Sequence, residues 1–381
     1  MIGALNRGGA EQVVINLCNH LNRDVFDVAV VSLSDDIPMA ERLIQREKVP
    51  VYTCGRLPGI PPLRNFIKTA WNLRKVIIRF EPDIVHSHLY SFNAPLQWLG
   101  SLGLKCKHFV TIHSVGYHYS KHDHWPSKVF RLCEKLNVKL SNAYVISVSN
   151  SVRAVLSQIS LFQSSKIKTI YNGINTQCFL YKESLVFKYG STLDKDYKNL
   201  FVVHIARFYE VKGHRYLLQA WPKVVAEVPE ARLLLVGDGP LKGEMQRLAD
   251  ALGAVESVRF MGLRDDVPAI LACCSLGVFP SLFEGLPVAP IEMMSMGLPV
   301  VASDIGPLRE VIGDEEAGIL FPPKHPDELA KAIVCLLKDD ALRERLGKAA
   351  RQRACRLFSV ERQVAEHERL YLNLLGLPHG R

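Results

Sequence analysis

The amino-acid sequence predicts an α/β protein made of two doubly wound, Rossmann-like domains, each with a parallel sheet. The chain has 381 residues, which is long for one ordinary core and suits two domains. Short apolar runs rich in β-branched residues alternate with helical patterns, as they do where helices cover both faces of a parallel sheet. These runs form two series, separated by an irregular polar stretch over residues 172–199.

The expected elements follow in chain order. The strands of the first series are expected over 26–33, 83–88, 108–112, 143–148 and 167–171. Those of the second series are expected over 200–206, 231–236, 257–261, 276–280, 299–302 and 318–321. Helical periodicity covers 214–227, 240–252, 327–338 and 341–357, and a last helical pattern covers 360–375. We therefore place the two domains at 1–175 and 176–359, with 360–381 after the second.

The start of the chain departs from the usual pattern of such a domain. A doubly wound domain usually opens with a buried strand that leads into a glycine-rich turn. Here Gly8 and Gly9 follow only the stretch MIGALNR, so the first strand is expected to be very short or missing. A misassigned start codon or a truncation would produce this pattern. A diglycine before an amphipathic helix can wrap a phosphate or an acceptor oxygen, although such turns are also common without a ligand.

Composition indicates a soluble globular protein in a reducing compartment. Hydrophobic residues make up 48% of the chain and charged residues 22%. No run of 18 uncharged apolar residues exists, and the first residues lack the layout of a signal peptide. The nine cysteines are scattered and form no CxxC pair, which favours reduced thiols in the cytoplasm over disulfides or a metal site.

The net charge of +9 is uneven along the chain. Residues 1–178 carry a balance of +10, whereas residues 179–381 carry −1. Residues 64–79 hold five basic and no acidic residues, interleaved with large apolar ones. This segment is either an interfacial helix on anionic lipid or an ordinary helix with a basic outer face. We expect peripheral contact with the inner face of the plasma membrane as the functional alternative to a solvated surface, and no binding of nucleic acid.

Two glutamates in the stretch SLFEGLPVAPIEMMSMGLPVVAS carry the most information about function. Glu284 lies in a Gly/Pro loop after an apolar strand, and Glu292 lies inside the helix that follows. A carboxylate beside a helix start can bind sugar hydroxyls, while the free N–H groups of the helix bind a phosphate. One short segment could therefore hold both ends of a nucleotide sugar.

A pair of cations stands at the end of the first strand of the second series. Arg207 and Lys212 are five residues apart in VHIARFYEVKG, where a loop could point both into the crevice at the carboxyl end of the sheet. Such a pair can hold a diphosphate, although on its own it is more often solvated surface. The later stretch LLVGDGPLKG, with Gly237, resembles half of a dinucleotide fingerprint, but its GxGxxxG spacing is one residue too long. A tight turn that lets a nucleoside approach is favoured over an NAD site.

Histidines gather in the first half. His113 ends a predicted strand, where it could donate to a sugar hydroxyl, and His86 is expected to be a hydrogen-bonded structural histidine. The spacing of His118, His122 and His124 is too loose for zinc, and the DxD pattern at 194–196 lies in a charged linker. No metal site is therefore predicted.

Taken together, these motifs resemble the retaining glycosyltransferases of family four, the group 1 or glycogen-synthase-like enzymes. The resemblance rests on the order ARF…KG, VGDGP, F-x-G-x-x-DDV, FEGLPVAPIE and G-P-x-x-E in the second half. In the first half GGAE, H-S-H, T-x-H and Asn172–Gly173–Ile174 also match. The resemblance implies a GT-B fold, in which two Rossmann-like domains face each other across a cleft and the final helix, within 360–381, crosses back onto the first domain.

The resemblance also implies a role for each matching position. Arg207 and Lys212 would hold the donor diphosphate, and Glu284 would bind the hydroxyls of the donor sugar. Glu292 would hold the ribose, and His113 would close on the donor from the first domain. The other donor-binding positions would be Gly8, Gly9, Gly237, Leu263, Gly285, Leu286, Pro287 and Val288.

The expected function is transfer of a sugar from a UDP- or GDP-sugar to a glycan or lipid-linked acceptor, in bacterial cell-surface polysaccharide or lipopolysaccharide synthesis. No cofactor and no metal are expected, because the two cations and a helix start can stabilise the leaving diphosphate. The alternatives are a nucleotide-sugar epimerase or a glycan phosphorylase of the same fold, a non-enzymatic binding protein, and an NAD-dependent oxidoreductase.

Overall fold

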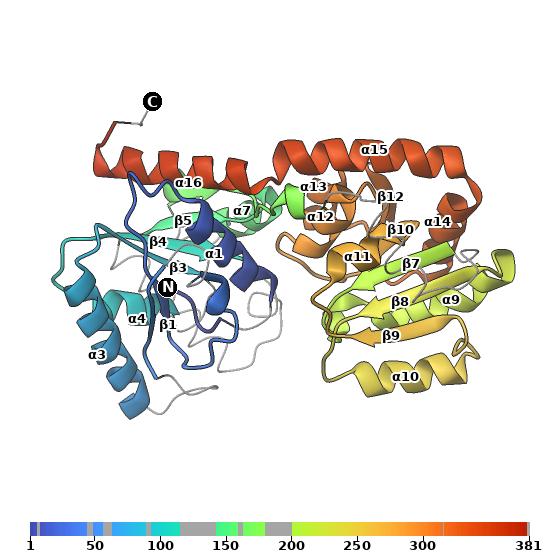
Figure 1. The fold of residues 1–381 in the computed structure, drawn as a ribbon, viewed down its shortest axis with the longest axis horizontal. Helices are drawn as coiled ribbons and strands as arrows, with labels where there is room; N and C mark the ends of the chain where they lie inside the picture. Colours follow the sequence, from blue (N-terminus) through green and yellow to red (C-terminus); the bar gives the residue numbers. More distant parts are fainter. Residues whose placement is uncertain are drawn as a thin grey trace. The chain divides into compact units, whose positions relative to one another are not determined.

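The computed structural model describes residues 1–5, 8–43, 49–55, 63–88, 93–114, 142–158, 163–179, 200–314 and 316–378. The chain divides into two compact units (Figure 1). The first comprises 1–173 together with 360–381, and the second comprises 174–359. The histidines at 118, 122 and 124 and the DxD pattern at 194–196 lie outside the described residues.

The first unit contains two parallel sheets. Its four-stranded sheet has the order β3-β4-β5-β6, with bounds Ile84–His88, Lys107–Ile112, Tyr144–Ser147 and Ile167–Thr169. Its two-stranded sheet pairs β1, Val30–Ser32, with β2, Val51–Thr53. The helices are α1 (Gly9–His20), α3 (Leu63–Phe80), α4 (Asn93–Gly100), α7 (Asn150–Ser157) and α16 (Val360–Leu375).

The segment Met1 to Gly3 lies between the two sheets. The Ile2 N–H donates to the Val31 carbonyl at 2.9 Å, and the Leu33 N–H donates to the Ile2 carbonyl at 2.9 Å. On its other side, the His88 N–H donates to the Met1 carbonyl at 2.8 Å. These three residues therefore act as a short strand between β1 and β3.

The last helix of the chain belongs to the core of the first unit. On α16, Val360, Val364 and Tyr371 pack with Leu17 of α1 and Phe109 of β4. The α16 side chain of Gln363 also accepts a hydrogen bond at 3.0 Å from the Gly173 N–H, where the chain leaves the first unit. The first unit is thus completed by residues that follow the whole of the second.

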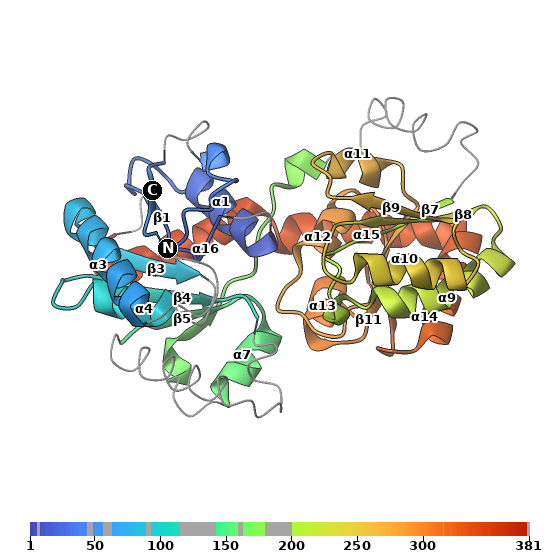
Figure 2. The same cartoon turned by 90° about the horizontal axis from the view of Figure 1, so that it is seen from below.

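The second unit is a single six-stranded parallel sheet with helices on both faces (Figure 2). The strand order is β12-β11-β10-β7-β8-β9, which read from β9 is the 3-2-1-4-5-6 order of a doubly wound dinucleotide-type domain. The strands are β7 (Leu200–Ile205), β8 (Ala231–Val236), β9 (Val258–Gly262), β10 (Leu276–Phe279), β11 (Val300–Ser303) and β12 (Gly318–Phe321). The helices are α9 (His214–Glu227), α10 (Lys242–Ala251), α11 (Val267–Ala272), α12 (Val288–Ser295), α13 (Gly306–Ile312), α14 (Pro326–Lys338) and α15 (Asp340–Leu357).

The core of the second unit explains why these segments fold as they do. Buried apolar side chains from every strand meet those of α9 and α14, and Trp221 lies at the centre, fully buried. The Trp221 indole N–H donates to the Ser257 hydroxyl at 3.0 Å, so its polar group is satisfied. Continuous apolar strands are expected where both faces of a parallel sheet are covered.

The predicted fold class is confirmed, and the strands fall close to the predicted ranges. Two differences concern the edge of the first unit. The predicted strand 26–33 is shorter, because the Phe26 N–H instead closes a turn by donating to the Asn22 carbonyl at 2.8 Å. The strand β2 was not predicted, since three residues are too few to show a periodic pattern. In the described part of the chain, no helix is long and apolar enough to cross a membrane.

Candidate active site

The candidate site lies at the switch point of the second sheet. β7 and β10 are neighbours in the sheet although β8 and β9 lie between them in the sequence. The loops that follow them, 206–213 and 280–287, therefore leave the same edge of the sheet next to each other. Open α/β sheets bind ligands in the crevice at this point, outside the carboxyl ends of the strands.

An ion pair joins the two loops. The Lys212 Nζ lies 2.6 Å from the Glu284 Oε1, and the side chain of Glu284 is only 7% exposed. The backbone strengthens the junction, because the Leu282 N–H donates to the Val211 carbonyl at 2.8 Å. The Lys212 Nζ also lies 5.6 Å from the ring centre of Phe279, the last residue of β10. The structure thus brings together two of the residues predicted to bind the donor.

Glycines allow these loops to approach so closely. Gly213 has φ +73°, and a Cβ there would collide with the carbonyl oxygen of Pro280 in the opposite loop. Gly237, after β8, has φ +139°, and a Cβ there would collide with the carbonyl oxygen of Ala206. The glycine at 237 is therefore needed for packing beneath the loop that carries Arg207, independently of any ligand.

Arg207 extends from the same loop as Lys212 but in a different setting. Its side chain is exposed, and its guanidinium carbon lies 5.6 Å from the ring centre of Tyr209. Among the described residues no carboxylate forms an ion pair with it. Since Glu284 already balances the charge of Lys212, Arg207 supplies the net positive charge of this group.

The helix α12 provides the second part of the site. It begins at Val288 after Pro287, and no side chain caps its first N–H groups. The positive end of the helix dipole therefore lies at the carboxyl edge of the sheet without a side-chain cap. Gly285, Leu286 and Pro287 are buried in the turn that leads into it.

Glu292 lies one turn into α12, and no cation of the described chain pairs with it. The residue as a whole is partly exposed, but its carboxyl is buried, and desolvation raises the pKa of this carboxyl to about 7. The charged form of a carboxyl with such a raised pKa needs hydrogen-bond donors to stabilise it. Leu263, just after β9, is 56% exposed at the same edge of the sheet.

His113, Gly8 and Gly9, which are predicted to contact the donor, belong to the first unit. His113 follows β4, and its Nε2 lies 3.2 Å from the Nδ1 of His88 on β3. Burial lowers the pKa of His113 to about 4, so its ring is neutral at neutral pH. Gly8 and Gly9 form the start of α1, where no side chain caps the helix. His86 hydrogen-bonds to Tyr371 at 2.6 Å and to Thr111 at 2.7 Å, the structural role expected of it.

Two buried histidines beneath the site were not predicted. His204 is the last residue but one of β7 and bonds through Nδ1 to the Val278 carbonyl at 2.9 Å. His214 follows Gly213 and stacks on Phe208, with ring centres 4.1 Å apart. The only sequence signal is their position, one in an apolar strand and one directly after the glycine of the site loop. The described residues contain no group of three or more His, Cys, Asp or Glu side chains that could hold a metal ion.

Comparison with known proteins identifies the family of the chain. Residues 199–339 match the model of the group 1 glycosyl transferases, and residues 7–177 match that of glycosyltransferase family 4. The putative glycosyltransferase EpsD of Bacillus subtilis is 30% identical over 309 residues, which cover 78% of each chain. The chain belongs to this glycosyltransferase family. The predicted resemblance is confirmed.

One further relative and one solved structure are similar to this chain. The N-acetyl-alpha-D-glucosaminyl L-malate synthase of Bacillus anthracis is 28% identical over 309 residues, or 80% of this chain and 78% of that one. The crystal structure of Anabaena HepE in complex with UDP and glucose superposes with a TM-score of 0.82 at 22% identity, covering 97% of this chain and 98% of HepE. The fold is GT-B, as the resemblance implied.

The buried histidines make the second unit sensitive to acid. Burial lowers the pKa of His204 to about 4 and that of His214 to about 2, against an ordinary value of 6.5. Below pH 6.5 these two histidines are protonated in the unfolded chain but stay neutral in the folded chain. The free energy of unfolding therefore falls as the pH drops from 6.5 toward 4. Each histidine contributes a slope of about 1.4 kcal/mol per pH unit in that window.

Urea unfolding at pH 7, 6 and 5, followed by tryptophan fluorescence, would measure this slope. A His204→Leu, His214→Leu double variant serves as the comparison, because it should show a shallower decline. Equal slopes in the two proteins would show that other groups cause the acid sensitivity.

Proposed function

We propose that this chain is a retaining, metal-independent glycosyltransferase that moves a sugar from a UDP- or GDP-sugar to a glycan or lipid-linked acceptor. The observation that carries the proposal is the Lys212–Glu284 pair at the switch point, next to the open start of α12. Charges of both signs and helix N–H groups stand together there, which suits a ligand with a polyhydroxyl part and a diphosphate part. Anabaena HepE, which has the same fold, was crystallised with UDP and glucose.

The proposed chemistry divides between the two loops. Breaking the bond between the anomeric carbon and the phosphate oxygen leaves negative charge on the diphosphate and positive charge on the sugar. Arg207, Lys212 and the start of α12 would stabilise the diphosphate through fixed positive charges and dipoles. Glu284, already bonded to Lys212, would accept hydrogen bonds from the sugar hydroxyls rather than attack the sugar. The acceptor would enter on the face of the leaving group and give its proton to a phosphate oxygen.

The acceptor side of the proposal rests on the first unit. Gly8, Gly9 and the neutral His113 are the positions of that unit that we expect to contact the donor. Cell-surface polysaccharide or lipopolysaccharide synthesis is the pathway we favour, because α3 presents a surface suited to a membrane.

One face of α3 combines positive charge with exposed apolar side chains. Ile67, Trp71 and Ile78 are 58%, 60% and 49% exposed. Exposed basic residues accompany them along the same helix: Arg64, Lys68, Lys75 and Arg79. At 100° per residue, all seven positions fall within about a third of the helix circumference. Such a face would rest on anionic lipid with its apolar groups inserted.

The substitution Glu284→Ala should abolish transfer while leaving binding of the free nucleoside diphosphate nearly unchanged. Loss of the group that holds the sugar hydroxyls should lower kcat/KM at least about 100-fold. A panel of UDP- and GDP-sugars, assayed by nucleotide release in the presence of candidate acceptors, would identify the donor first. Glu230→Ala is the matched control, because Glu230 is exposed and precedes β8 at the opposite edge of the sheet. Ordinary turnover in the Glu284 variant would remove the sugar-binding role.

Donor binding should weaken as the pH falls below about 7. The free carboxyl of Glu292 has a pKa of about 7, and ribose hydroxyls that donate to it favour the charged form. Glu292 must therefore lose its proton when the donor binds. The dissociation constant of the donor should rise up to about tenfold for each pH unit below 7. Calorimetric titration of the nucleotide sugar from pH 5.5 to 8.5 tests this. In the Glu292→Gln variant the dependence should vanish; a variant that keeps it would refute the assignment to Glu292.

Membrane contact through α3 should depend on its basic face. Lys68→Ala should weaken co-sedimentation with phosphatidylglycerol vesicles about fivefold, since each basic residue near an anionic surface contributes about 1 kcal/mol. Lys105→Ala is the control, because Lys105 is exposed on the same unit but outside α3. Equal loss in both variants, or equal binding to phosphatidylcholine vesicles, would argue against a specific surface.

A further inference from the structure

A chain of contacting rings, called the ring chain below, lies beneath the candidate site in the second unit. Phe260 of β9 and Phe208 of the first site loop have ring centres 5.9 Å apart, and Phe208 stacks on His214 at 4.1 Å. The His214 ring meets His204 of β7 at 4.6 Å, and His204 meets Phe279 of β10 at 5.4 Å. The ring chain therefore joins the loop after β7 to the strand that leads into the loop after β10.

The ring chain closes the base of the segment that carries Lys212. Phe208 and His214 flank residues 209–213, and their rings stack on each other at an interplanar angle of 23°. Both side chains are buried, at 0% and 3% exposed. A loop whose two ends are joined by a buried contact has few other conformations available to it. The backbone position of Lys212 therefore depends on this contact.

The other end of the ring chain comes close to the Lys212 ammonium. Phe279 meets His204 edge to face, at 74°, and the Lys212 Nζ lies 5.6 Å from the centre of the Phe279 ring. The same Nζ lies 2.6 Å from the Glu284 Oε1. The His204 ring is itself fixed, because its Nδ1 donates to the Val278 carbonyl at 2.9 Å. Burial lowers the pKa of His204 to about 4, and the backbones of Val278 and Lys212 oppose this shift. His204 thus contacts both the ring beside the ammonium and the base of the loop.

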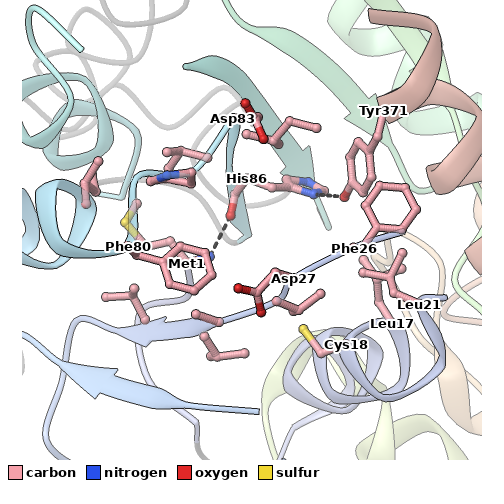
Figure 3. A pocket seen from close by; sticks show the side chains of 18 of the residues that line it. Met1, Leu17, Cys18, Leu21, Phe26, Asp27, Phe80, Asp83, His86 and Tyr371 are labelled. Atoms are coloured by element: carbon pink, nitrogen blue, oxygen red, sulfur yellow. Dashed lines mark hydrogen bonds between the residues drawn. The ribbon is translucent and has the colours of Figure 1, made fainter. Parts of the chain in front are cut away.

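Packing alone does not explain why these two positions hold histidine. Within the described part of the chain, no hydrogen bond of ordinary geometry reaches the Nε2 of His204 or either ring nitrogen of His214. Buried polar atoms without partners cost desolvation free energy that an aliphatic side chain would avoid. His86 of the first unit shows the usual arrangement, because its buried ring bonds to Tyr371 (Figure 3) and to Thr111. Such a cost directly beneath a candidate active site indicates a role in that site.

We propose that His204 and His214 are positioning residues, whose rings hold the loop 206–213 against β10 and thereby set the Lys212 ammonium against Glu284. Both rings are buried, so they act through Lys212. Their effect on sugar transfer rests on the proposed function, in which Lys212 stabilises the leaving diphosphate. Their effect on the ion pair requires no ligand. Leucine at 214 would fill the space and remove the unpartnered nitrogens, but it offers no ring plane to stack on Phe208.

The ligand-free test measures how readily Lys212 is acylated. His214→Leu and His204→Asn each remove one ring, and asparagine can keep the backbone hydrogen bond of His204 through its amide N–H. With limiting acetic anhydride and peptide mass spectrometry, the acylation rate of Lys212 should rise at least about fivefold in each variant, because acylation needs an open ion pair. Lys338 is the internal reference, since its Nζ also lies 2.6 Å from a carboxylate, that of Glu227.

Melting temperature separates positioning from a structural role. Val224→Ala is the matched control, because Val224 of α9 is fully buried in the same core but lies outside the ring chain. It should lower the melting temperature by about 5 °C through the cavity that it leaves, with Lys212 acylation unchanged. His214→Leu should do the reverse at pH 7, with faster acylation and a melting temperature equal to or above that of the parent.

The transfer assay then shows whether the ion pair matters for chemistry. His214→Leu and His204→Asn should lower kcat at least about tenfold, since small misplacements of a catalytic group are costly. The KM for the donor should change less than about twofold, because Lys212 is assigned to charge that develops as the bond breaks. Val224→Ala should keep the parental kcat.

Parental acylation of Lys212 in both ring variants would overturn the proposal, and so would faster acylation that appears only where the melting temperature falls. Unchanged kcat in variants with faster acylation would refute the role of the rings in transfer. If the parent releases no nucleotide from any nucleotide sugar, the proposed function fails, and the acylation rates still decide whether the rings position Lys212.

Discussion

The close approach of the loops after β7 and β10 is the constraint on which the candidate site depends. Gly213 removes the side chain that would collide with Pro280, and the Leu282–Val211 hydrogen bond then fixes the two backbones. Only at that separation can Lys212 reach Glu284 at 2.6 Å. A cation and a carboxylate that would otherwise be solvated on separate loops become one preorganised group, and preorganisation is what makes charges effective in stabilising a transition state.

The sheet order determines why these two loops meet. In the 3-2-1-4-5-6 order the chain moves outward from β7 to β9 and then returns to β10 on the other side of β7. Open α/β sheets bind ligands at such a reversal, outside the carboxyl ends of the strands. The start of α12 lies at this edge of the sheet because the loop 280–287 leads from β10 into it. Charged side chains and helix N–H groups are therefore brought to the same edge by the strand order.

Much of the fold was predictable because long apolar runs have few ways to be buried. The strands β7, β8 and β10 and the helices α9 and α16 lie within a few residues of their predicted ranges. The contact of His88 with His113, and that of His204 with His214, was not predictable, because each joins residues from different elements. The packing role of Gly237 was not predictable from the sequence either, since a turn that binds a nucleoside and one that packs on Ala206 both favour glycine.

The sequence by itself determined the fold class, the family and the loop positions of Arg207, Lys212 and Glu284, because these follow from local periodicity and motif order. Only the tertiary structure decided how those residues share their charges. It paired Lys212 with Glu284, left Arg207 exposed and placed Glu292 where desolvation raises its pKa to about 7. The physical reason is that Coulomb energy and desolvation depend on distance and burial. Spacing along the chain does not fix either quantity.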